Sequence, residues 1–239
     1  MTNLTSRMGA AIGALCLAVS ASACGLIDSD VTDFDLSLPD KSFTIDTGGW
    51  DVDPAATMAL TSTSCASMPA ACNQAAMAAC PMDCTARCGA SNTCELDLDV
   101  SLYQLVDLFA EKPELQSIND RAIIDVTVDS VTYTVTANTL NVDTPEMKVY
   151  VAPMSVMDPT DPSAQQIGTI AAVAAGTTTM GPKPFVFTAA GKAKLVDIMA
   201  TFKTPFNILV GSTLTATAST PVPTGRLDAV ISIKGHAGL

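Results

Sequence analysis

Cysteine is the residue type whose spacing in this chain most clearly indicates chemistry. An even number of cysteines in an exported chain is typical of a disulfide framework. Neighbouring cysteines on one helix seldom have the geometry to bond each other. We therefore expect three disulfides that staple a helical hairpin, with partners on a facing helix or on flanking segments, and the pairing stays open among 15 connectivities. The six cysteines lie within thirty residues: Cys65, Cys72, Cys80, Cys84, Cys88 and Cys94.

A metal or iron–sulfur site is the alternative for the same cysteines. Cys80, Cys84 and Cys88 are each separated by three residues, which matches the radical-SAM triad only in part, because that family has a shorter second gap. Residues 51–93 contain no histidine. An oxidising compartment favours disulfides over free thiols. We therefore predict no metal site and no cofactor in this segment.

Carboxylates form a second candidate group. Glu95, Asp97 and Asp99 alternate with apolar residues, which places them on one side of a predicted strand. Ca²⁺ requires many oxygen ligands, and the EF-hand spacing is absent. Acidic residues on the solvent face of a strand are the ordinary arrangement. These three residues are weak calcium candidates, and Asp158 with Asp161 form another such group in a loop.

Catalytic signatures are scarce. The only histidine, His236, lies three residues from the C-terminus, and we expect it to be an exposed tail residue. The chain has no Gly-x-Ser-x-Gly motif, phosphate loop or dinucleotide fingerprint. A glycosidase carboxylate pair stays open, with the single tryptophan, Trp50, as its only aromatic support. We predict that the protein is not an enzyme.

The first residues are typical of an export signal. Arg7 precedes an apolar run over residues 8–21, and small residues follow it. The run has fourteen residues, which is shorter than the roughly 20 that a helix needs to cross a bilayer. We predict a signal peptide over residues 1–23 and a tether over residues 24–33.

The cleavage region, Ala21, Ser22, Ala23 and Cys24, resembles the lipobox of bacterial lipoproteins. Ala21 departs from the family, which usually has Leu there, and the resemblance covers only the first tenth of the chain. It implies lipidation of Cys24, a membrane anchor and a bacterial cell-envelope location. Ordinary cleavage with a free Cys24 is the alternative.

Cysteine parity favours lipidation. Cys16 leaves with the signal, so lipidation of Cys24 leaves six cysteines, whereas a free Cys24 leaves seven. An unpaired thiol is unusual in a secreted chain. By analogy with known lipoproteins, Gly25 suits sorting to the outer membrane, on its periplasmic or surface face.

Charge excludes one class of partner. Removing residues 1–23 removes one arginine and no acid, so the formal charge changes from −12 to −13. Binding to nucleic acid depends on neutralising phosphates with Lys and Arg, and the chain has no basic cluster. We therefore exclude nucleic-acid binding.

Hydrophobic alternation predicts a mainly β protein. Residues 34–239 are expected to form one antiparallel β-sandwich of eight to ten strands, with a barrel around a lipid as the competitor. A cysteine-rich helical insert at about 51–93 interrupts it, with helices from Pro69 to Ala79 and from Pro81 to Gly89. Further short helices are expected at about 104–118 and, capped by Thr188, at 189–202.

These features predict a membrane-anchored extracytoplasmic module that binds or scaffolds an unknown protein without catalysis. The alternative is a periplasmic or outer-membrane carrier of a lipid or another hydrophobic ligand. It is suggested by the apolar run at 167–175. A hydrolase is a third hypothesis, for which no acid can be named.

Overall fold

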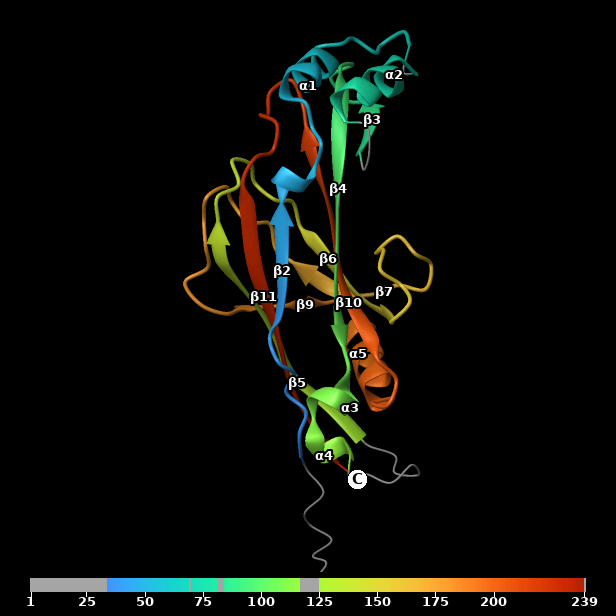
Figure 1. The fold of residues 1–239 in the computed structure, drawn as a ribbon, viewed down its shortest axis with the longest axis vertical. Coiled ribbons are helices and arrows are strands. Elements are labelled where there is room, and N and C mark those ends of the chain that lie inside the picture. The colour runs from blue at the N-terminus through green and yellow to red at the C-terminus, as the bar shows by residue number, and fades with distance from the viewer. Residues whose placement is uncertain (1–33, 69, 81–83, 117–124, 239) are drawn as a thin grey trace, which may run out of the picture. The chain divides into compact units, whose positions relative to one another are not determined.

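Eleven β-strands dominate the part of the chain that the computed structural model describes, which is residues 34–68, 70–80, 84–116 and 125–238. All of these residues belong to one compact unit, 33–239. The predicted signal peptide, Cys24 and the tether lie outside the described residues. The strands form two antiparallel sheets (Figure 1).

One sheet has five strands and is built around the C-terminal strand β11. β1 and β2 pair one after the other along the same edge of β11, and β5 pairs along its other edge. β8 pairs with β5 and ends the sheet. The strands are β1 (Phe34–Asp35), β2 (Lys41–Asp46), β5 (Asp125–Asn138), β8 (Lys183–Pro184) and β11 (Arg226–Gly238).

The other sheet has six strands in the order β3-β4-β10-β6-β7-β9. β4 and β10 form its longest ladder, from Leu96↔Ala216 to Val106↔Phe206. β3 covers only the first residues of β4. The strands are β3 (Cys84–Cys88), β4 (Cys94–Val106), β6 (Met147–Pro153), β7 (Gln165–Ile170), β9 (Val186–Phe187) and β10 (Phe206–Ala216).

Alternating side chains fill the space between the two sheets. In β4, Leu96, Leu98 and Val100 are buried, whereas Asp97 is half-buried and Asp99 is exposed. Buried residues of both sheets join one hydrophobic cluster. The prediction of a mainly β, antiparallel sandwich with a disulfide-stapled helical insert is confirmed. Three strands of only two residues, β1, β8 and β9, raise the strand number above the expected eight to ten.

A bulge explains one change in the alternating pattern. Val126 and Val128 are buried, and so are Val131 and Tyr133, although the two pairs are out of phase. Both pairs belong to β5, whose register against β11 skips Asp129. One extra residue in a strand turns the following side chains to the other face. This inserted residue keeps both apolar sets directed at the core.

The cysteine-rich cap, residues 51–93, connects β2 of one sheet to β4 of the other. Its helices are α1 (Pro54–Thr61) and α2 (Ala70–Ala79), preceded by a 3₁₀ turn, η1 (Thr47–Gly49). The predicted helix ending at Ala79 is confirmed. α1 was not predicted, although Asp53 caps it by accepting a hydrogen bond of 2.8 Å from the Ala56 amide, and Pro54 occupies its first turn.

The helix expected from Pro81 to Gly89 is wrong for its described part. Residues 84–88 form β3, an edge strand that pairs with the first residues of β4. Asn92, with φ of 59°, lies in the tight turn of this hairpin. The spacing of four between Cys84 and Cys88 suits a helical face, but pairing with β4 supplies hydrogen bonds that local periodicity does not reveal.

Two further helix boundaries differ from expectation. β4 continues to Val106, so the helix expected at 104–118 is reduced to α3 (Leu108–Glu111) and α4 (Pro113–Gln116) within the described residues. The helix expected at 189–202 is α5 (Gly191–Ala200). Thr188 does not cap it: its hydroxyl lies 3.4 Å from the Ile167 carbonyl oxygen, and the residue at the cap position is Ala190.

The cap and the start of β1 lie at opposite ends of β11. The loop that precedes Arg226 lies beside α1, whereas Phe34 pairs with Ala237. Ala237 follows Arg226 by eleven positions, which corresponds to about 36 Å of extended strand. Figure 1 shows α1 and α2 at one end of the sandwich and α3 and α4 at the other.

Candidate functional site

Three disulfides connect the cysteines of the cap. Cys65, which follows α1, bonds Cys88 of β3, and Cys72 of α2 bonds Cys94 of β4. Both bonds therefore join the helical part of the cap to a strand, as the prediction of flanking partners required. The third bond is local and joins Cys80, just after α2, to Cys84. The expectation that cysteines four residues apart do not pair is wrong here, because Cys84 lies in a strand and not on the same helix.

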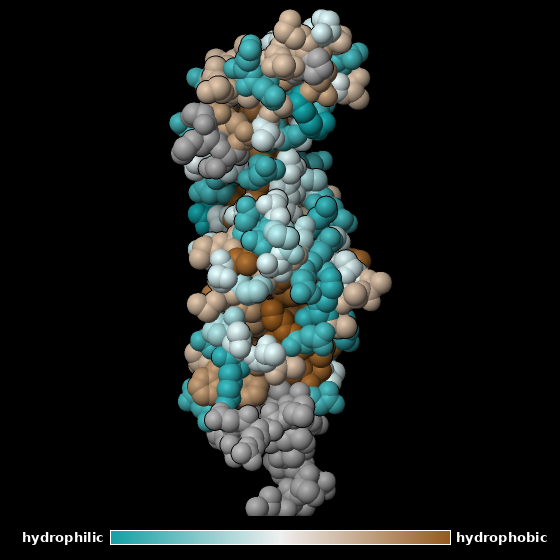
Figure 2. Space-filling model, turned by 90° about the vertical axis from the view of Figure 1, so that its right-hand side faces the viewer, coloured by the Kyte–Doolittle hydropathy of each residue, from teal (hydrophilic) through white to brown (hydrophobic). Residues whose placement is uncertain are grey.

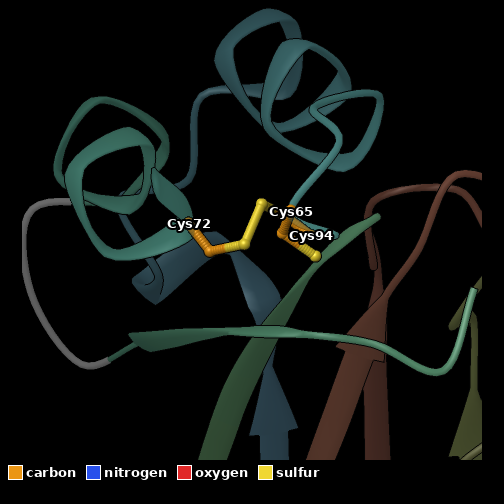
Figure 3. Close-up of side chains that lie close together, drawn as sticks. All are labelled: Cys65, Cys72 and Cys94. Atoms are coloured by element: carbon orange, nitrogen blue, oxygen red, sulfur yellow. A yellow bond between two sulfur atoms is a disulfide. The ribbon is translucent and has the colours of Figure 1, made fainter. Parts of the chain in front are cut away.

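Two of these disulfides are packed against each other. The Sγ atoms of Cys65, Cys72 and Cys94 all lie within 4.8 Å of one another, although only Cys72 and Cys94 are bonded (Figure 3). All three side chains are 0 % exposed. The cluster therefore joins the segment after α1, helix α2 and strand β4 at one buried point.

The acidic row on β4 is occupied by hydrogen bonds and ion pairs. Arg87 of β3 bonds Glu95 Oε2 at 2.7 Å and Asp97 Oδ2 at 2.6 Å. The hydrogen bond to Asp97 raises the pKa of the Arg87 guanidinium. Two of the acids also accept hydrogen bonds from threonine hydroxyls of β10. Asp97 accepts one from Thr215 at 2.7 Å, and Asp99 accepts one from Thr213 at 2.9 Å. The three weak calcium candidates thus act as cross-strand partners on the outer face of the sheet.

A surface hollow lies between β2 and β4 and reaches the cap at Cys84 and Thr85. Its volume is about 710 Å³, and we name it the Trp50 hollow. The carboxylates in its lining come from three distant parts of the sequence. The residues that line it are Thr44, Ile45, Asp46, Trp50, Cys84, Thr85, Asp99, Val100, Ser101, Leu102 and Asp158.

Asp158 connects this hollow to a second one. It lines both the Trp50 hollow and a neighbouring hollow of about 540 Å³, which also contains Tyr150 and Glu146. Its Oδ1 atom accepts hydrogen bonds from the amide of Thr160 at 2.7 Å and from its hydroxyl at 2.8 Å. These bonds lower the pKa of Asp158 and keep the carboxylate charged.

The Trp50 hollow offers an indole ring, hydroxyl groups and carboxylates to a ligand. This combination suits a polar ligand with a flat apolar face or with hydrogen-bond donors, because indole supplies contact area and carboxylates accept hydrogen bonds. Trp50 and Asp99 are separate features of the sequence, and no pattern in it connects them. The uniqueness of Trp50 was the only available signal.

His236 is not a tail residue, so that prediction is wrong. It lies in β11, opposite Thr127 of β5, and its Nδ1 atom is 3.1 Å from Asp129 Oδ2. Its side chain is 44 % exposed. Pairing with β5 holds the last residues of the chain in the sheet, which local sequence near a terminus does not indicate.

A small cavity lies between the two sheets. It has a volume of about 10 Å³ and is lined by apolar residues of both sheets, including Phe43, Leu102, Val210 and Ile231. A single water molecule needs about 10–15 Å³. A lipid chain therefore does not fit into this cavity.

Large apolar side chains are exposed near both ends of the sandwich. Met58 and Met77 in the cap are 65 % and 78 % exposed. At the other end, Leu105 near the end of β4 is 49 % exposed and Phe109 of α3 is 37 % exposed. Figure 2 shows hydrophobic areas among hydrophilic ones on one face of the molecule. These exposed side chains offer apolar contact area to a partner on the surface of the protein.

Comparison of the chain with protein-family models, with curated proteins and with solved structures found no match. Among the residues that the structure describes, no helix combines the length and apolar character that crossing a membrane requires.

Proposed function

We propose that this protein is an exported lipoprotein of a bacterial cell envelope, anchored through an acylated Cys24, which binds an extracytoplasmic partner through its surface and catalyses no reaction. The anchor belongs to the outer membrane in this proposal, as Gly25 suggests. The six disulfide-bonded cysteines support export, since disulfides persist in oxidising compartments.

The placement of β1 is the observation that carries the proposal. Phe34 is the first described residue after the predicted tether, and it pairs at the end of β11 that is remote from the cap. A chain anchored at Cys24 would therefore enter the sandwich at one end and present the cap at the other. The Trp50 hollow, which includes Cys84 and Thr85 of the cap, would then lie toward the cap end of the sandwich.

The small volume of the cavity between the sheets favours surface binding over the carriage of a hydrophobic ligand. Ligand pockets commonly have volumes of about 300–1,000 Å³. The cavity between the sheets has about 10 Å³, whereas the Trp50 hollow has about 710 Å³. A barrel enclosing a lipid is also not the architecture observed, because the strands form two separate sheets.

Replacing the anchor residue tests the first half of the proposal. In bacteria that express the full chain, we expect the parent protein to fractionate with the outer membrane and its N-terminal peptide to begin with an acylated Cys24. Cys24→Ser should release the protein in soluble form, because the lipid would be the only anchor. Cys16→Ser is the matched control and should leave lipidation intact. An unmodified Cys24 in the exported parent would overturn the anchor.

Site-specific photo-crosslinking tests the second half. A photoreactive residue at Thr85, which is exposed and lines the Trp50 hollow, should capture a discrete partner in intact cells. The same residue at Thr127, which is exposed on β5 of the other sheet, should not. Replacing Trp50 by Ala should weaken the Thr85 product. Equal products from both positions, or none from Thr85, would contradict binding through this hollow.

A further inference from the structure

Two different disulfides bring their sulfur atoms together at one buried point of the cap. Sγ atoms of Cys65, Cys72 and Cys94 lie within 4.8 Å of one another, and they belong to two different disulfides. The fourth sulfur of these two bonds, that of Cys88, is bonded directly to Cys65. Three sulfur atoms therefore form one group, and the fourth, on the β3–β4 hairpin, is bonded to one of them.

The hairpin register brings the two strand cysteines face to face. Cys88 of β3 is the cross-strand partner of Cys94 of β4. Directly opposed residues in an antiparallel pair have Cβ atoms about 4.5–5.5 Å apart. This register comes from backbone pairing of β3 with β4, and no disulfide joins the two residues to each other.

We infer that, once both disulfides are reduced, Cys65, Cys72, Cys88 and Cys94 form a binding site for one Zn²⁺ ion. Tetrahedral zinc binds thiolates at about 2.3 Å, which places the sulfurs about 3.8 Å apart. For Cys65, Cys72 and Cys94 the observed limit of 4.8 Å lies about 1 Å above this separation. Cys88 does not belong to this group, so its thiolate would have to turn toward the other three after its bond to Cys65 opens.

The chemistry of the two states balances with a dithiol as the reductant. Two dithiol molecules supply four electrons and four protons, cleave the two S–S bonds, and are themselves oxidised to two disulfides. Zn²⁺ then replaces the four thiol protons and forms four Zn–S bonds. Binding therefore releases protons and weakens as the pH falls.

The donor set favours zinc among the common divalent ions. All four ligands are soft thiolates, which suit Zn²⁺ and not the oxygen-seeking Ca²⁺ or Mg²⁺. Three of the four side chains are 0 % exposed and that of Cys88 is half-buried, and four-cysteine sites are typical of structural zinc. Zinc would hold the reduced cap together in place of the two lost crosslinks.

Titration of the reduced full chain tests this inference. After treatment with a phosphine reductant and removal of oxygen, we expect the protein to bind one Zn²⁺ in native mass spectrometry and in competition with a chromophoric chelator. Co²⁺ in its place should give the intense visible absorption of tetrahedral cobalt thiolate. The oxidised protein should bind neither ion.

Matched cysteine variants locate the site, and reduction makes them comparable because no variant then has a disulfide. Cys72→Ser should weaken zinc binding at least about 100-fold, because even the loss of an outer partner costs about 10–100-fold. The double variant Cys80→Ser and Cys84→Ser removes the third bond, which lies outside the cluster, and should bind zinc as the parent does. Circular dichroism with zinc should show a higher thermal midpoint for the reduced parent.

Two results would overturn the inference. One is a reduced parent that binds zinc no more tightly than Cys72→Ser. The other is a Cys80/Cys84 variant that loses zinc to the same extent as Cys72→Ser. Both outcomes are independent of lipidation, so the inference and the proposed function fail separately.

Discussion

Cys72 on α2 and Cys94 at the first position of β4 form a disulfide that fastens the helical cap to the six-stranded sheet, and both side chains are 0 % exposed. The bond closes a sequence separation of 22 residues, whereas the Cys80–Cys84 bond closes a separation of 4. Long-range disulfides restrict the unfolded chain more than local ones. The two bonds therefore differ in how much they stabilise the cap.

We predict that the double variant Cys72→Ala and Cys94→Ala loses about 3 kcal/mol of unfolding free energy, and that Cys80→Ala with Cys84→Ala loses about 2 kcal/mol or less. Each variant removes a complete pair and leaves no new free thiol. Urea unfolding of the oxidised proteins, followed by circular dichroism, measures the difference. A larger loss for the Cys80/Cys84 pair would show that this chain-entropy argument does not describe the cap.

Ile231 tests whether the interior is filled as the structure indicates. It is 2 % exposed and lines the small cavity of about 10 Å³ between the sheets. We predict that Ile231→Ala lowers the free energy of unfolding by about 2–5 kcal/mol, and Ile231→Val by about 0.5–1.5 kcal/mol. Denaturant titration gives both values.

Native mass spectrometry of the soluble Cys24→Ser form should also detect no bound lipid. A stoichiometric lipid in that form would contradict a filled core. A core that tolerated Ile231→Ala without loss would do so as well, since only a loosely packed interior accommodates such a deletion.

The strands were predictable because their chemistry is local. In β2 and β4, alternation of apolar and polar residues assigns each side chain to the core or to solvent, and the structure confirms this for Phe43 and Ile45 as well as for Leu96 and Leu98. For each of these residues, its own polarity and its place in the alternation predict whether the side chain is buried.

The errors arose where distant segments decide the outcome. Cys84 and Cys88 have helical spacing, but β4 converts their segment into an edge strand. His236 has no local sign of order, yet pairing with β5 places it in the sheet. The Trp50 hollow combines Trp50 with Asp158, which is 108 residues away in sequence, and no periodicity connects them.

Asn207 holds the loop after β6 against the outer face of β10. Its side chain is 1 % exposed, and its Nδ2 atom donates hydrogen bonds to the carbonyl oxygens of Met154 at 3.0 Å and Val156 at 2.8 Å. We predict that Asn207→Ala lowers the free energy of unfolding by about 1–3 kcal/mol, because two carbonyl groups lose their buried donor.

Hydrogen exchange of the amides at 154–157 should accelerate in Asn207→Ala, while exchange in the cap should not change. Asn207→Asp is the matched isosteric variant, and it should be at least as destabilising, since a carboxylate places acceptor oxygens opposite two carbonyl oxygens. Unchanged exchange at 154–157 in both variants would mean that these two hydrogen bonds do not hold the loop.

Asp228 gives the fold a defined response to acid. Its carboxylate is held by the guanidinium of Arg226, with Nε at 2.9 Å from Oδ1, and by the hydroxyl of Thr44 on β2, at 2.7 Å from Oδ1. The hydrogen bond from Arg226 and then that from Thr44 lower the pKa of Asp228 below its ordinary value of 3.8. A lowered pKa means that the folded state binds the proton less readily than the unfolded state does.

The stabilising contribution of Asp228 is therefore complete above the unfolded pKa and is lost as the pH falls through the lower folded pKa. Acidification from about pH 5 to about pH 2 should reduce the unfolding free energy of the parent more than that of Asp228→Asn, which has no charge to neutralise. Asp51→Asn, at an exposed position, is the control and should follow the parent curve. If Asp228→Asn and the parent lost stability in parallel over this range, the link between β2 and β11 through Thr44 and Asp228 would contribute nothing to the acid response of the sandwich.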